Sequence, residues 1–108
     1  MAVGVNDEDI YAAIKSIESM GGGLVAIDQG AVCASLALPI AGLMTDQSLE
    51  QVVGLLEELE LAAGRMGCCI PSPFSVLSFL ALPVIPELKI TDLGLVDVVR
   101  GRLVGEDA

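Results

Sequence analysis

The sequence predicts an α+β fold: two main helices and a short buried helix packed on a small, mostly antiparallel sheet, all within a single domain. Its 108 residues are the usual length of one domain. Residues 7–20 and 49–66 repeat apolar side chains at intervals of three and four, which is the period of an amphipathic helix. Between and after these stretches, short apolar runs alternate with glycine- and proline-rich turns, a pattern typical of strands.

The first helix has clear signals at both ends. A short apolar run at residues 2–5 predicts a strand, and Asn6 follows it as an N-cap. Three carboxylates in the next turn favour the positive end of the helix dipole. Gly21-Gly22-Gly23 ends the helix, with Gly21 in the left-handed position. The apolar stripe predicted to be buried is Ile10, Ala13, Ile14, Ile17 and Met20.

A hairpin and an unusual loop come next. Residues 24–27 and 31–38 are strand-like, and the turn at residues 28–30 predicts that they pair antiparallel until Pro39. Residues 38–44 then form an apolar loop without a regular pattern. Such a loop is unusual on a surface that faces water.

The second helix is predicted to begin after an N-cap at Asp46 or Ser48, and Ser48 with Gln51 fits a capping box. Gly54 weakens it by about 1 kcal/mol relative to alanine, and Gly67 ends it. Its predicted buried stripe is Leu49, Val52, Val53, Leu56, Leu59, Ala63 and Met66.

The last third predicts a short helix and two strands. Ser72 is the expected N-cap of a helix that begins at Pro73 and is apolar on nearly all sides, so we expect it to be buried. Residues 88–91 and 95–99 have strand character around a turn at residues 92–94. Residues 100–108 are expected to fray.

Composition restricts the partners of the chain. Apolar residues make up 54% and charged residues only 19%, less charge than a free-standing domain of this size usually carries. We therefore expect apolar surface to face another domain or another copy in a homo-oligomer. Fifteen acids against five bases give a net charge of −10, so neither nucleic acid nor a membrane is an expected partner.

Cysteines and apolar runs indicate a cytoplasmic protein. Cys33, Cys68 and Cys69 lack a CxxC spacing, and we interpret them as buried, reduced thiols rather than a metal or redox site. The longest apolar stretch, residues 73–86, is interrupted by Pro83 and is shorter than the roughly 20 residues that span a bilayer. The N-terminus lacks the basic and apolar regions of a signal peptide.

The absence of histidine limits the chemistry of this chain. It excludes a Ser-His-Asp triad, a Cys-His pair and a histidine-bearing zinc site within these residues. The glycine triplet at residues 21–23 follows a helix and precedes a strand, the reverse of a phosphate-binding loop, so we interpret it as a helix end. Asp92, Asp97 and Glu87 could form an acidic pair or an oxygen-ligand metal site; we prefer solvated turn carboxylates.

Several segments, in order along nearly the entire chain, match the pattern of a known family. They are Val3-Gly4-Val5-Asn6-Asp7-Glu8-Asp9, Met20-Gly21-Gly22-Gly23-Leu24-Val25, residues 36–46 (LALPIAGLMTD), Pro73-Phe74, residues 77–92 (LSFLALPVIPELKITD) and Gly94-Leu95-Val96-Asp97. Through these segments the chain resembles the C-terminal domain of bacterial and archaeal adenine deaminases of the amidohydrolase superfamily. Three short departures are Ser75-Val76 in place of Met-Thr, Ala37 in place of a proline, and the extra Cys69.

The resemblance implies a parent reaction, the hydrolysis of adenine to hypoxanthine and ammonia. In such enzymes manganese or iron is held by histidines and carboxylates of a (β/α)8 barrel that precedes this domain. The barrel ligands lie outside the matched segments, so no catalytic, cofactor-binding or metal residue is expected here. The chain looks like a C-terminal fragment or the small piece of a split enzyme.

The expected role is structural: docking on an amidohydrolase barrel domain or subunit through two apolar segments. One alternative is a free-standing oligomeric binding module without catalytic activity. Another is an independent enzyme in which Asp92 or Asp97 holds a hard cation. The predicted docking surface consists of Leu38, Pro39, Ile40, Leu43, Met44, Phe74, Leu77, Phe79, Leu82 and Pro83.

Overall fold

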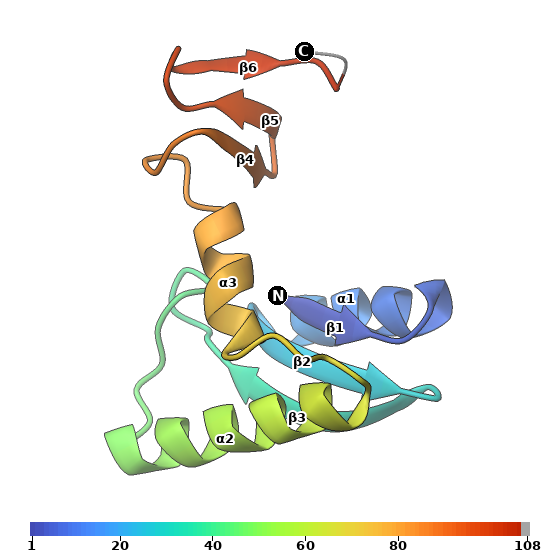
Figure 1. The fold of residues 1–108 in the computed structure, drawn as a ribbon. Coiled ribbons are helices and arrows are strands. Elements are labelled where there is room, and N and C mark those ends of the chain that lie inside the picture. The colour runs from blue at the N-terminus through green and yellow to red at the C-terminus, as the bar shows by residue number, and fades with distance from the viewer. Residues whose placement is uncertain (107–108) are drawn as a thin grey trace. The chain divides into compact units, whose positions relative to one another are not determined.

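Three helices and two three-stranded sheets make up residues 1–106, the part of the chain that the computed structural model describes (Figure 1). The predicted α+β class is confirmed, with mostly antiparallel pairing. Where the sequence predicted one small sheet, the structure has two, which lie in two compact units, one over residues 1–73 and one from residue 74 onward. Each unit has its own sheet.

The first unit contains a three-stranded sheet and the two longer helices. Its elements are β1 (Ala2–Gly4), α1 (Asp7–Met20), β2 (Gly23–Asp28), β3 (Ala31–Ala37) and α2 (Leu49–Arg65). The strand order is β1-β2-β3, with β1 parallel to β2 and β2 antiparallel to β3. The predicted hairpin is therefore confirmed.

Local signals set the ends of α1 as the sequence predicts. The Asn6 side chain accepts a hydrogen bond from the Asp9 N–H at 2.8 Å. Gly21 adopts a left-handed backbone with φ of 75°, and its N–H donates to the Glu18 carbonyl at 3.2 Å. A residue with a side chain rarely adopts this conformation, so glycine is favoured at the helix end.

The core of the first unit surrounds β2, which is buried along almost its whole length. Val25 and Ile27 pack against Ala13 of α1. Because side chains alternate along a strand, Leu24 and Ala26 point to the opposite face. That face is covered by α2, whose buried residues are Leu59, Ala62 and Ala63 (Figure 1).

The predicted buried stripes are only partly correct. In α1 Ala13 is buried, but Ile10 and Ile14 are exposed and Asp9 is buried instead. In α2 the first two turns extend beyond the sheet, so that Leu49 and Val53 are exposed. The 3.6-residue period fixes which residues share a stripe, but the neighbours of a helix decide how far that stripe is covered.

The second unit contains α3 (Pro73–Leu80), β4 (Leu88–Thr91), β5 (Gly94–Asp97) and β6 (Arg102–Val104). The strands form an antiparallel sheet in the order β4-β5-β6. The strand β6 corrects the expectation that residues 100–108 fray: residues 102–104 pair with the free edge of β5. Residues 107–108 lie outside the described residues.

The short helix α3 also differs from its prediction. Pro73 and Phe74 are buried, whereas Val76, Phe79 and Leu80 are exposed. Ser72 has a φ of 48° rather than the extended backbone of an N-cap. The prediction that α3 is buried is therefore wrong for most of the helix, because no other element of the second unit covers it extensively. No helix within residues 1–106 is long and apolar enough to cross a membrane.

Candidate functional site

An exposed apolar turn lies between the first sheet and α2. Ala41 and Gly42 both have positive φ, 57° and 72°, as in a type I′ turn, and the Leu43 N–H donates to the Ile40 carbonyl at 3.1 Å. Ile40 and Met44 form an isolated antiparallel bridge. The bridge holds the turn in one shape, and Leu43 at its tip is 74% exposed.

The turn is anchored on the glycine triplet. The Leu38 N–H donates to the Gly22 carbonyl at 3.0 Å. A Cβ atom on Gly22 would lie 2.6 Å from the Gly42 Cα and 3.0 Å from the Leu38 carbonyl oxygen. Only glycine permits this backbone approach. The sequence analysis assigned the triplet to the helix end alone. A helix end needs only Gly21, so the two further glycines were the sequence signal for a close backbone contact.

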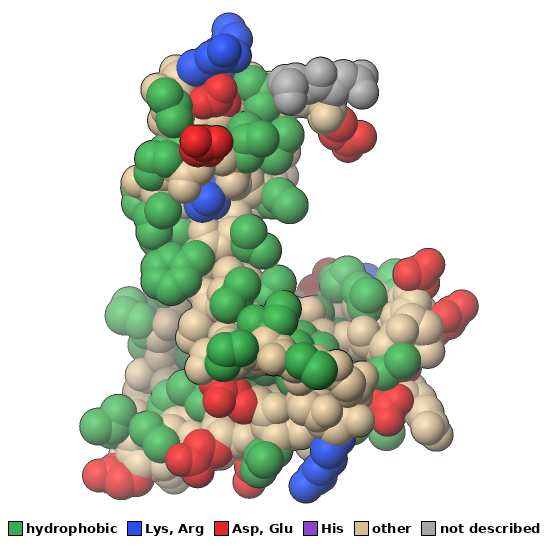
Figure 2. Space-filling view, in the orientation of Figure 1, with side chains coloured by type: hydrophobic (Ala, Val, Ile, Leu, Met, Phe, Trp, Pro, Cys, Tyr) green, Lys and Arg blue, Asp and Glu red, His purple; other side chains and the backbone are tan. Residues whose placement is uncertain are grey.

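The predicted docking residues fall into two groups, one in each unit. In the first unit Pro39, Ile40, Leu43 and Met44 are exposed and Leu38 is half-buried. In the second unit Phe79, Leu82 and Pro83 are exposed, and Leu77 is half-buried. Phe74 is only 3% exposed, so it belongs to the interior and not to a surface. Figure 2 shows apolar side chains gathered around α3, and both apolar and charged side chains over the second sheet.

The predicted acidic residues are only partly brought together. Glu87 and Asp97 line one hollow of about 360 Å³ in the second unit, together with Arg100. The Asp97 carboxylate accepts from the Arg100 N–H at 2.9 Å and lies 3.5 Å from the Arg100 Nε. Asp92 does not line this hollow. Among residues 1–106 no three side chains of the His, Cys, Asp and Glu types gather as metal ligands would.

The cysteines form no disulfide in the described residues. The prediction that they are buried is wrong for Cys33 and Cys69, which are exposed, and Cys68 is half-buried. Cys33 is the extra residue where the register between β2 and β3 shifts. An extra residue in a strand interrupts the ladder and turns its side chain away from the regular alternation.

Asp9 has a role that the sequence analysis missed. Its side chain is almost fully buried, and its carboxylate accepts from the N–H of Gln29 at 3.2 Å and of Gly30 at 2.7 Å. Gln29 and Gly30 both have left-handed φ, which turns successive N–H groups toward one acceptor. At the opposite end of β2, the Met1 amino group donates to the Gly23 carbonyl, and burial lowers the pKa of that amino group.

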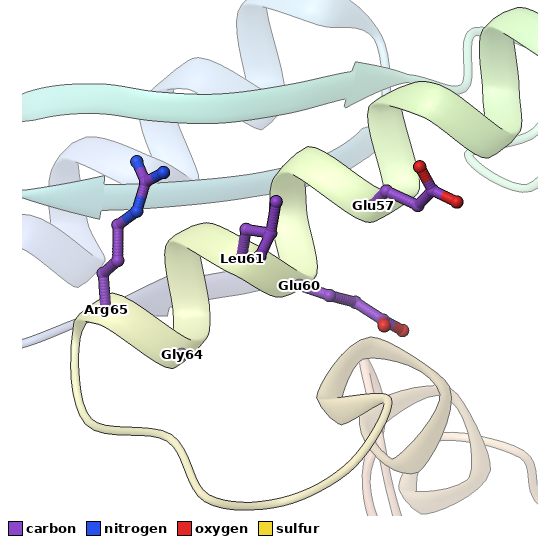
Figure 3. A pocket seen from close by; sticks show the side chains of 5 residues that line it. All are labelled: Glu57, Glu60, Leu61, Gly64 and Arg65. Carbon is purple, nitrogen blue, oxygen red and sulfur yellow. The ribbon is translucent and has the colours of Figure 1, made fainter.

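A hollow of about 610 Å³ runs along α2. Figure 3 shows its lining, in which the charged ends of Glu57, Glu60 and Arg65 point away from one another. Every lining residue comes from this one helix, so the hollow is an open helix face. A ligand site needs polar groups that converge, and this surface lacks them.

Comparison with known proteins decides the family. A family model described as the adenine deaminase C-terminal domain matches residues 1–102. This chain belongs to that family. The resemblance expected from the sequence segments is therefore confirmed.

Curated relatives place this adenine deaminase C-terminal domain within longer proteins. The adenine deaminase of Dehalococcoides mccartyi is 50% identical over 99% of this chain, which spans 19% of that relative. The one from Desulfatibacillum aliphaticivorans is 55% identical over 91% of the chain, spanning 17% of the relative. A protein named adenine deaminase 2 from Carboxydothermus hydrogenoformans is 50% identical over 91% of this chain, and the matched region spans 17% of that relative. The chain thus corresponds to less than a fifth of these proteins.

Proposed function

We propose that this chain is a structural, docking domain of an adenine deaminase, the enzyme that converts adenine and water to hypoxanthine and ammonia. The proposal is carried by one observation: a family match over residues 1–102 in a chain that spans 19% or less of its adenine deaminase relatives. The remaining four fifths of such a protein leave ample length for a separate catalytic domain.

The donor set of this chain does not fit the manganese or iron of the parent enzyme. The sequence contains no histidine, and no group of three suitable ligands occurs in residues 1–106. Under the proposal the metal is held by an amidohydrolase barrel outside this chain, and no catalytic step is assigned to a residue here.

The proposed docking residues are the exposed turn Leu38, Pro39, Ile40, Leu43 and Met44 together with Leu77, Phe79, Leu82 and Pro83. Burying one large apolar side chain contributes roughly 1.5–3 kcal/mol. The turn is held by its own backbone hydrogen bonds, so docking need not order it first. The same exposed apolar area supports association between copies of the assembled protein. Free cysteines without a disulfide favour the cytoplasm as its compartment.

A chimaera tests this proposal. In the Dehalococcoides mccartyi adenine deaminase, the region matched by this chain is replaced by the chain itself, and ammonia release from adenine is measured with added manganese or iron. The chimaera should retain the activity of its parent, and the isolated chain should release no ammonia above the blank.

Two outcomes would contradict the proposal. Turnover by the isolated chain would place catalytic groups within it. An inactive chimaera alongside an active parent would favour a free-standing oligomeric binding module instead.

A further inference from the structure

One side of the second sheet carries four apolar residues, next to the charged Asp97 and Arg102, which lie in register with Leu88 on the same side. Ile90, Leu95 and Val104 lie directly opposite one another across the three strands, so their side chains point to the same side. Leu88, two residues before Ile90, shares that side. We call these four residues the apolar sheet face. The other side carries Lys89, Val96 and Leu103 in register.

Within the second unit the apolar sheet face is open to water. Ile90 is 66% exposed and Leu88 is also exposed, while Leu95 and Val104 are half-buried. Within the second unit α3 does not pack extensively on the sheet. Leu88, Val99 and Val104 also line the hollow of about 360 Å³, together with Glu87, Asp97 and Arg100. Protein-binding surfaces typically combine apolar side chains with polar and charged ones in this way.

The small size of the second unit indicates that this face has a cover. Units below about 40 residues rarely bury enough surface to be stable without a disulfide, a metal or a partner. The described part of the unit runs only from residue 74 to residue 106 and contains no disulfide and no group of metal ligands. A sheet of this kind needs a hydrophobic face packed against another element.

We infer that the apolar sheet face docks on the larger portion of the adenine deaminase chain, the four fifths that this chain does not span. The inference rests on the proposed function and adds a contact surface that the sequence analysis did not identify. The area of the apolar sheet face indicates which partner covers it. Three strands about 4.8 Å apart and four residues long present a face of roughly 150–200 Å².

That area is too small to hold two separate copies together. A stable interface between independent chains buries about 800 Å² per partner. A partner in the same polypeptide is present at an effective concentration in the millimolar range, so a small apolar face is sufficient there. The relatives, in which this domain is part of one long chain, provide such a partner.

The test compares two substitutions in the chimaera described above. Ile90→Glu places a carboxylate on the apolar sheet face, and Leu103→Glu places one on the other side of the same sheet. The two residues are similarly exposed, 66% and 55%, so neither change removes a core residue of this chain. Amide hydrogen exchange at residues 88–104 is measured in both variants, in the unsubstituted chimaera and in the isolated chain.

We expect residues 88–104 to exchange about tenfold or more slowly in the chimaera than in the isolated chain, because docking suppresses local opening. Ile90→Glu should abolish this protection and Leu103→Glu should retain it. Exchange in the chimaera as fast as in the isolated chain would overturn the inference, as would equal effects of the two substitutions. An inactive chimaera contradicts the proposed function, whereas its exchange rates still decide whether the sheet face is covered.

Discussion

Asp9 joins α1 to the β2–β3 hairpin through its carboxylate, which accepts from two backbone N–H groups of the turn. We predict that Asp9→Ala destabilises the first unit by about 2–3 kcal/mol, because two backbone N–H groups of the turn lose the buried carboxylate that accepts from them. Urea unfolding measures the loss, and amide exchange at Gly30 locates it. Asp7→Ala is the control, since Asp7 is exposed in the same helical turn and contributes about 0.3–1 kcal/mol through the helix dipole. Equal losses in the two variants would contradict the prediction.

The selection of Asp9 could not be read from the sequence. Asp7, Glu8 and Asp9 are chemically alike, and each suits the first turn of a helix. Which of them is buried depends on the rotation of α1 about its axis, and this rotation is fixed by the contact of Ala13 with Val25 and Ile27. The same rotation leaves Ile14 in water, although its spacing predicted burial.

Gly22 provides a second prediction at the scale of a residue. A methyl group there would meet the backbone of the exposed turn at 2.6 Å, and the φ of 122° is unfavourable for alanine. Gly22→Ala should destabilise the first unit by at least about 1–3 kcal/mol and displace the turn. Gly54→Ala is the matched control in α2, where a methyl group meets nothing within 4 Å. It should stabilise by about 0.5–1 kcal/mol. Thermal unfolding measures both, and the same sign for both would refute this account.

At the scale of elements, α2 depends on the capping box at its start. The Ser48 N–H donates to the Gln51 side chain at 3.1 Å, and the Ser48 hydroxyl accepts from the Gln51 N–H at 3.4 Å. We predict that Ser48→Ala costs about 1 kcal/mol and that Ser48→Asp, which keeps an acceptor, costs much less. Helix content and melting temperature by circular dichroism provide the measurement. No difference between the two substitutions would mean that the cap contributes nothing.

Elements with local signals were predicted well. Caps at Asn6, Gly21 and Ser48 fixed both long helices, and the turn at residues 28–30 fixed the hairpin. The strand β6 was missed because three residues carry too little pattern on their own, and their pairing depends on the free edge of β5. The burial of α3 was overestimated, since composition indicates that a helix avoids water but not whether its cover belongs to the same chain.

At the scale of the whole molecule, exposed apolar area and negative charge oppose each other. The described part of the chain exposes large apolar side chains in both units, and the net charge of −10 keeps copies apart. We predict that the isolated chain binds hydrophobic dye and self-associates more strongly in about 0.5 M salt than at low salt, where the Debye length is longer. Light scattering measures the association. A monodisperse chain that binds little dye at both salt concentrations would contradict the prediction.

The sequence did not predict the division into two units, each with its own sheet. Short strands separated by turns predict a sheet but do not say which strands share it, because pairing depends on distant contacts. Among the residues predicted to dock, the turn residues Leu43 and Met44 and Phe79 are exposed, whereas Phe74 is buried. Their docking role stays a prediction. The sequence indicated only a hairpin that contains Leu88, Ile90 and Leu95. The register of β4, β5 and β6 in the structure places these three residues on the same side as Val104.

The apolar sheet face also has a consequence for mutational tolerance. If every position from 88 to 104 of the chimaera is randomised and active clones are sequenced, the accepted residues should follow the pleat of the strands. Positions 90, 95 and 104, which lie in one row across the sheet, should admit almost only apolar side chains. Positions 96 and 103, in the adjacent row on the opposite side, should admit charges freely. Tolerance for charged residues would then differ between the two rows, and this difference would identify the side of the sheet that is buried in the assembled enzyme.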